Sequence, residues 1–215
     1  AGAVATFLIG RRSEILLAML TAFGVVMAVS SLTWRVWRHG PQRHAIGGWS
    51  APLGIDLYAD GFTVLMLLMS AVVGTLTSIY AVGYFSSPAN SDDVHDLAHS
   101  HEGPFFWPLW LFLWAALHAL FLSADIFNVY VTFELLGLAA VALVNLAGSQ
   151  AALTAGMRYL LTSLLGSLLY LLGVAMVYAA FATLDMQTLS TRMTTSLAAQ
   201  VALACIGVAR FLNYG

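Results

Sequence analysis

The 215-residue chain is 60% hydrophobic and only 8% charged, and its mean hydropathy is +0.87. An ordinary soluble domain carries about a quarter charged residues, so this composition excludes a water-soluble fold. The formal net charge of −2 argues against a nucleic-acid partner, and the single cysteine, Cys205, excludes an internal disulfide framework. All eight basic residues are arginine, so no lysine is available to relay protons.

Long apolar runs recur along the chain. A hydrocarbon core of about 30 Å requires about 20 apolar residues per helix. We therefore predict an all-α, polytopic transmembrane helical bundle that forms a single membrane domain over residues 1–215. Neither end carries a polar tail, and the start lacks a signal-peptide pattern, so we expect a fragment or a truncated chain. Five full spans are predicted at 14–34, 61–84, 105–122, 126–147 and 158–181, with a partial first span at 1–9 and a partial last span from 197.

The connections between these spans differ in charge. One is basic, with Arg35, Arg38 and Arg43, whereas residues 86–104 form an acidic, histidine-rich loop. Because arginines fall on both sides of the predicted bundle, the positive-inside rule does not fix its orientation. Residues 48–60 are expected to form a turn and a short extended piece outside the membrane. An interfacial aromatic belt is expected from the tryptophans near span ends, which are Trp34, Trp37, Trp49, Trp107 and Trp110.

The loop 86–104 holds the only histidine cluster that suggests a metal. His95 and His99 are four residues apart and would share one face if the segment were helical, and His101 follows. A solvated loop that gathers cations or protons at a channel mouth is the preferred interpretation. Since the chain also lacks a nucleotide loop, a nucleophile elbow, a haem site and an iron–sulfur pattern, we expect no metal and no cofactor.

Glu134 is the most informative residue. It lies eight residues into its predicted span, hence about 12 Å deep by helical rise and close to the bilayer midplane. A charged carboxylate there costs at least about 2.5–3.5 kcal/mol, so such residues usually face a bundle interior or a water path. Burial favours the neutral acid and a nearby cation favours the ionised form, so a movable partner could make Glu134 bind and release a proton. The alternative is a protonated glutamate that bonds a neighbouring helix.

Two further groups near this span have competing interpretations. His118 lies about 6 Å by helical rise from the same membrane face, so one or two waters could join it to Glu134 as a short relay. It could equally bond a main-chain carbonyl or Asn128. Asp125 and Ser123 are expected to cap the helix that follows them, because Asp and Ser satisfy the free N–H groups at helix starts.

Three stretches resemble a known family. They read GGWSAPLGIDLYADGFTVLMLLMSAVVG, LFLSADIFNVYVTFELLGLAAVALVNLAGS and MRYLLTSLLGSLLYLLGVAMVYA, and together they cover most of residues 48–186. They are similar to the antiporter-like subunits shared by Mrp-type sodium/proton antiporters and respiratory complex I, most of all to the D subunit of the Mrp complexes. The stretch around Glu134 is the most specific part of the resemblance.

The resemblance implies a role for Glu134 and a difference at Arg210. It implies a larger bundle with two inverted repeats, in which Glu134 matches the glutamate of the fifth helix. In the family that glutamate pairs with a lysine of the seventh helix, whose approach and retreat move protons. Here Arg210 is the nearest charge partner, and the family's proline-containing stretch is absent. Arginine keeps its proton, so Arg210 could hold Glu134 ionised but could not join a relay.

The function implied is that of a membrane subunit in a multi-subunit cation/proton antiporter, with Glu134 in a proton path. Its expected partners are homologous membrane subunits, protons, monovalent cations and lipid, and its expected location is the inner (plasma) membrane. By itself the chain is expected to be a transporter subunit rather than an enzyme. Two alternatives stay open. The chain could be a proton-pumping subunit of a complex I-like or membrane-bound hydrogenase complex, and it would then be part of an NADH–quinone oxidoreductase-like translocase. It could also be a transport-inactive structural subunit.

Overall fold

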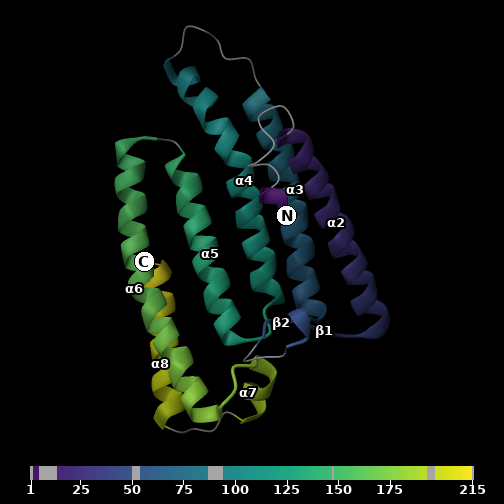
Figure 1. Cartoon of the computed structure of the whole chain (residues 1–215), viewed down its shortest axis with the longest axis vertical. Helices are drawn as coiled ribbons and strands as arrows, with labels where there is room; N and C mark the ends of the chain where they lie inside the picture. Colours follow the sequence, from purple (N-terminus) through teal and green to yellow (C-terminus); the bar gives the residue numbers. More distant parts are fainter. Residues whose placement is uncertain are drawn as a thin grey trace.

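The computed structural model describes residues 2–4, 14–49, 54–86, 94–146, 148–192 and 197–214. Long helices lie side by side and reverse direction at each connection, with a small hairpin at one end of the bundle (Figure 1). The helices are α2 (Glu14–His39), α3 (Gly61–Ser86), α4 (Val94–Leu122), α5 (Ile126–Asn145), α6 (Gln150–Phe181), α7 (Met186–Arg192) and α8 (Leu197–Tyr214). Strand β1 (Gln42–Ala45) pairs antiparallel with β2 (Asp56–Ala59), and a short 3-10 turn, η1 (Ile46–Gly48), follows β1.

Within the described residues, five helices are long and apolar enough to cross a membrane. They are α2 to α6, which confirms the prediction of an all-helical membrane bundle with five full spans. The last predicted run, from residue 197, corresponds to α8. The chain is therefore a multi-pass membrane protein.

Helices α2 and α6 extend beyond the predicted spans. Helix α2 ends at His39 rather than at residue 34, and α6 begins at Gln150 rather than at residue 158. The reason is that the span criterion counts only the apolar residues needed to cross hydrocarbon, whereas a helix can continue into the interfacial region. At α6 the start is set by a cap, because the Ser149 hydroxyl accepts a hydrogen bond from Ala152 N at 3.1 Å.

The prediction that residues 86–104 form a loop is wrong for the second half of this segment. Helix α4 begins at Val94, so the histidine-rich sequence belongs to a helix rather than to a loop. The side chains of His95, His99 and His101 lie outside the described residues. The interpretation of this segment as a gathering point for cations, and the weaker metal hypothesis, therefore stay predictions.

Some tryptophans that were predicted to form a belt at the membrane surface pack between α3 and α4. Trp107 is only 2% exposed, and Trp110 Nε1 donates to Ser78 Oγ at 2.9 Å. Trp114 Nε1 donates to Ser70 Oγ at 3.2 Å, and its ring fills the space where Gly74 lacks a Cβ. Trp107 and Trp110 therefore lie on the α4 face that packs against α3, whereas Trp34, Trp37 and Trp49 are exposed. The position of these five tryptophans at the membrane interface stays a prediction.

Three connections meet at the hairpin end of the bundle (Figure 1). Strand β2 bridges to the α4–α5 turn through Leu57 and Ser123, and the turn bridges to the α6–α7 connection through Asp125 and Asp185. The extended piece predicted within residues 48–60 is β2, and its partner β1 was not foreseen. These backbone links fix where α5 begins.

Candidate functional site

The start of α5 is set by a buried polar cap. Asp125 Oδ1 accepts a hydrogen bond from Asn128 N at 2.6 Å, and Asn128 Nδ2 donates to Ser123 Oγ at 2.9 Å. This confirms that Asp125 caps the helix, with Ser123 tied to the same cap. Burial raises the pKa of Asp125, aided by the nearby carboxylates of Asp56 and Asp185 and partly offset by main-chain hydrogen bonds from Asn128 and Phe127.

Helix α5 presents different side chains to its two neighbours. Asn128 and Thr132 are buried on one face, and Thr132 Oγ1 donates to Asn128 O at 2.9 Å. Glu134 lies about 200° around the helix from Thr132, since each residue turns about 100°. Its face is therefore directed away from the Asn128 and Thr132 face.

Glu134 lines a cavity of about 220 Å³ between α5 and α6. Helix α5 contributes residues spaced mostly three or four positions apart, on one face of the helix, and α6 contributes two serines and two tyrosines. The rings of Tyr130 and Tyr170 stack with centroids 6.0 Å apart, and Tyr170 Oη donates to Ile126 O at 3.3 Å. The lining residues are Tyr130, Phe133, Glu134, Leu136, Gly137, Ala140, Tyr159, Ser163, Ser167 and Tyr170.

The Glu134 carboxylate is half-buried and makes no hydrogen bond or ion pair to any residue that the structure describes. Apolar and aromatic groups dominate its surroundings. Among the described residues that line the cavity, Glu134 is therefore the only carboxylate, and it has no partner there.

His118 and Glu134 do not line the same cavity. The His118 ring packs 5.5 Å from the Trp114 ring and bonds the Trp114 backbone, on the face of α4 that contacts α3. Its Nε2 atom is buried and has no partner among the described residues. Of the two alternatives, the bond to a main-chain group is present, whereas Asn128 bonds Ser123 instead. A relay from His118 to Glu134 stays a prediction, and it would have to pass around α5.

Arg210 lies in α8, which packs along α6, the helix that forms the other wall of the Glu134 cavity. The Arg210 side chain lies outside the described residues. Its pairing with Glu134 is therefore still a prediction. Within the described part of the chain, no group of three or more His, Cys, Asp or Glu residues could hold a metal ion.

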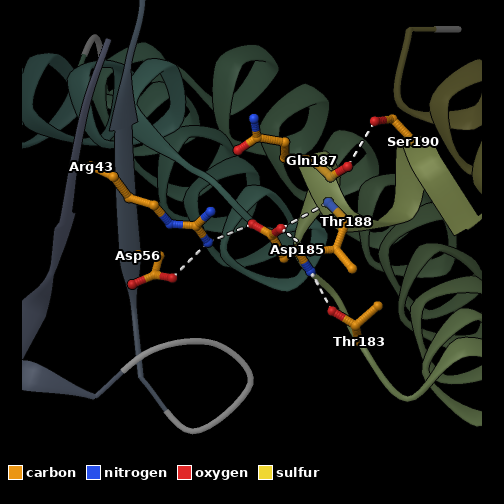
Figure 2. A network of polar contacts seen from close by, with 7 residues as sticks. All are labelled: Arg43, Asp56, Thr183, Asp185, Gln187, Thr188 and Ser190. Carbon is orange, nitrogen blue, oxygen red and sulfur yellow. Dashed lines mark hydrogen bonds and ion pairs between the residues drawn. The ribbon is translucent and has the colours of Figure 1, made fainter.

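A second polar site at the hairpin end was not foreseen from the sequence. Arg43 Nη2 lies 2.8 Å from Asp56 Oδ2 and 2.6 Å from Asp185 Oδ1 (Figure 2). Asp185 Oδ2 also accepts hydrogen bonds from the main chain and hydroxyl of Thr188, at 2.9 and 2.6 Å, at the start of α7. We call Arg43, Asp56 and Asp185 the Arg43 network. No local pattern could have found it, because its members come from three distant segments.

Contacts within the Arg43 network shift the pKa values of Arg43 and Asp185. Hydrogen bonds to Asp56 and then to Asp185 raise the pKa of Arg43. Burial alone would raise the pKa of Asp185, but hydrogen bonds from Thr188 and Arg43 outweigh it and lower that pKa below its usual range. Arg43 and Asp185 are therefore both ionised at neutral pH.

Two family models match the chain. Residues 123–212 match the family described as NADH:quinone oxidoreductase/Mrp antiporter, TM, and this segment includes Glu134 and its cavity. Residues 46–91 match the family described as NADH-Ubiquinone oxidoreductase (complex I), chain 5 N-terminus, and include β2 and α3. The two matches together span most of the described bundle.

Similar proteins include two bacterial sodium/proton antiporter components. The D subunit of the Na(+)/H(+) antiporter of Bacillus subtilis is 33% identical over 196 residues, which are 91% of this chain and 37% of that protein. The corresponding D subunit of Alkalihalophilus pseudofirmus is 29% identical over 170 residues, which are 79% of this chain and 32% of that protein. The chain therefore spans less than two fifths of the length of these relatives.

Solved structures show the same fold. A chain of the membrane-bound sulfane sulfur reductase, an archaeal respiratory membrane complex, has a TM-score of 0.81 at 26% identity, covering 97% of this chain and 41% of that chain. A chain of the Mrp complex from Dietzia has a TM-score of 0.75 at 22% identity, covering 96% of this chain and 36% of that chain. A chain of respiratory complex I from Thermus thermophilus has a TM-score of 0.65 at 20% identity, covering 97% and 41%.

Proposed function

We propose that this chain supplies a proton-binding carboxylate to a multi-subunit cation/proton antiporter. The chain belongs to the antiporter-like membrane subunits of the Mrp antiporter and respiratory complex I family, and it resembles the Mrp D subunit. Glu134 is that carboxylate. The observation that supports the role is its position in the cavity between α5 and α6, with no cation beside it among the described residues. A nearby positive charge that comes and goes would make it release and rebind a proton.

The proposal includes the setting in which Glu134 works. The similar solved chains come from multi-subunit membrane complexes, so the partners proposed here are other membrane subunits of a hetero-oligomer. The transported ions are protons and monovalent cations, and the exposed apolar faces of α2 and α3 contact lipid. The location proposed is the plasma membrane, by analogy with the bacterial relatives.

Replacement of Glu134 tests this function. We expect Glu134→Gln, in the assembled complex reconstituted into vesicles, to lower proton flux at least about a hundredfold, because Gln cannot exchange a proton. Thr162→Val on α6 is the control, since the Thr162 hydroxyl is exposed and bonds only its own helix at Arg158 O. Unchanged flux in Glu134→Gln with intact assembly would refute the proton role and favour a structural role for the chain.

Arg210 is the proposed charge partner of Glu134. Because an arginine keeps its proton, its role would be to favour the ionised carboxylate rather than to carry the proton. Arg210→Gln is then expected to slow proton release and lower flux, while Arg210→Lys retains part of the flux. Equal flux in Arg210→Gln and the unmodified complex would exclude this pairing.

A second host complex has a specific observation in its favour. The archaeal sulfane sulfur reductase chain is similar over 97% of this chain with a TM-score of 0.81. The alternative is therefore a proton-pumping subunit of a respiratory redox complex. Purification of the native complex distinguishes the two, because a redox host would contain redox-active subunits whose absorbance changes on reduction and an antiporter would not.

A further inference from the structure

The Ser167 hydroxyl makes no bond of the kind that several other helical hydroxyls make. Thr75, Ser78 and Thr162 each donate to the carbonyl four residues earlier, at 2.7–3.0 Å. Ser167 is in the middle of α6 and only 2% exposed, yet its Oγ atom has no hydrogen-bond partner among the described residues. A buried hydroxyl without a partner is unfavourable, and more so at hydrocarbon depth, so a further group is expected to bond it.

Ser167 lines the cavity that contains Glu134. The two side chains reach it from different helices, Ser167 from α6 and Glu134 from α5. Both have unused hydrogen-bonding capacity among the described residues, and a small molecule between them could satisfy both.

We propose that the Ser167 hydroxyl holds a water molecule that also hydrogen-bonds the Glu134 carboxylate, so that protons enter and leave Glu134 through the α6 side of the cavity. This deepens the function proposed above and rests on Glu134 being the proton-binding group. A proton leaving Glu134 passes to the water oxygen, and this water passes one of its own protons to a second water in the cavity. Ser167 keeps its proton and is a positioning residue.

Water fits this cavity better than a bare cation does. A water needs two to four polar partners and about 30 Å³, so 220 Å³ has room for several molecules. A dehydrated cation needs a cage of several oxygen ligands. The lining provides one carboxylate and the hydroxyls of serines and tyrosines among apolar side chains, and Tyr170 already donates to Ile126 O. Hydration is therefore the inferred use of the Ser167 hydroxyl.

The test replaces Ser167 in the assembled complex and measures both proton flux and the infrared carbonyl band of protonated Glu134. In Ser167→Ala we expect flux to fall about fivefold to tenfold, the equivalent of one net hydrogen bond. The band is expected to move to higher frequency, because the carboxyl group loses a hydrogen-bonded water. Ser167→Cys is the second variant, for the case in which alanine impairs assembly. Cysteine is close to serine in size but forms only weak hydrogen bonds, so its flux and band should change in the same direction as those of Ser167→Ala. Thr162→Ala is the control on the same helix and should change neither reading.

The outcomes separate this inference from the proposed function. Loss of flux in Glu134→Gln together with an unchanged flux and band in the Ser167 variants would overturn the water link and leave the proton role intact. Unchanged flux in Glu134→Gln would refute the proton role, and the proposed proton route past Ser167 would be refuted with it. A band that shifts with added sodium at constant pH, only while Ser167 is present, would overturn water as the occupant in favour of a cation.

Discussion

Arg43 Nη2 lies 2.6 Å from Asp185 Oδ1, although the two residues are 142 positions apart in the chain. The same nitrogen contacts Asp56 on β2, so one guanidinium joins the hairpin to the start of α7 (Figure 2). Between them runs the α4–α5 turn, where Ala124 N donates to Asp56 O at 3.1 Å and Ala124 O accepts from Met186 N at 3.0 Å. The Arg43 network therefore clamps the turn from which α5 begins.

Removal of the Arg43 charge should destabilise this end of the bundle. Asp56 is 2% exposed, so Arg43→Gln removes the cation that is paired with a buried carboxylate. Because Arg43 itself is 39% exposed on its side chain, we expect a cost of about 2 kcal/mol rather than the larger cost of a fully buried pair. Thermal unfolding of the purified protein in detergent measures it.

Arg38→Gln is the matched control for that experiment. Arg38 lies 4.6 Å from the centroid of the Trp34 ring and makes no ion pair within the described residues. Its replacement should cost less than about 1 kcal/mol. Equal losses for the two variants would show that the Arg43 network does not stabilise the fold.

The contribution of Asp185 to the stability of the fold should depend on pH. Its pKa is lowered below the ordinary 3.8 in the folded chain, so its stabilising effect is complete above about pH 3.8 and is lost as the pH falls through the folded value. The difference in melting temperature between the unmodified protein and Asp185→Asn should therefore be largest at neutral pH. It should shrink as the pH falls below about 3.8 and through the folded pKa of Asp185, and a difference independent of pH would contradict the role of the charge.

The sequence was sufficient for the spans but not for the Arg43 network. Span prediction works because a lipid-facing helix must be apolar over a fixed length, which is a local property. The ion pairs depend instead on which connections share one membrane end and how they pair. Arg43 could be placed in a connection from the sequence, but its partner at Asp185 required the fold.

Asp125 is predicted to act as a cap rather than as a charge. Its pKa is raised by burial, so ionisation lowers the stability of the fold as the pH rises through the folded value. Asp125→Asn retains a good capping residue and loses this cost, so at neutral pH it should be within about 1 kcal/mol of the unmodified protein. Asp125→Ala loses the bond to Asn128 N and should be about 1 kcal/mol less stable than Asp125→Asn. Denaturant unfolding of both variants compares them, and equal stability would refute the cap.

Gly74 should be intolerant of a side chain, unlike Gly83 on the same helix. A Cβ at Gly74 would overlap the Trp114 ring, whereas a Cβ at Gly83 has nothing within 4 Å. Gly74→Ala forces α3 and α4 apart or displaces a ring that bonds Ser70, at a cost of about 1–3 kcal/mol. Gly83→Ala should be neutral or stabilising because Ala favours the helix. Thermal unfolding of both variants tests this, and similar effects would contradict the close contact of the two helices.

The candidate site was found only in part from the sequence. Glu134 could be singled out because an acidic residue in an apolar span is costly wherever it faces. Ser167 could not, since a serine in a helix usually bonds its own backbone, and only the structure shows that Ser167 lines the cavity of Glu134 and that its hydroxyl has no partner among the described residues. The predicted link from Glu134 to His118 depended on depth alone. Depth does not specify which face of a helix a side chain occupies.

Replacement of His118 tests whether depth in the membrane or the face of the helix decides which residues join a proton path. Its ring packs on Trp114 in the α3–α4 interface, so His118→Phe should keep the aromatic contact and remove the buried Nε2 atom that has no described partner. We expect the assembled complex to retain proton flux within about twofold and stability within about 1 kcal/mol. His118→Ala should instead cost about 2–3 kcal/mol through the lost packing, again with little effect on flux per assembled complex. A loss of flux in His118→Phe comparable to that of Glu134→Gln would restore the relay, because phenylalanine can fill the space of the imidazole but cannot pass a proton.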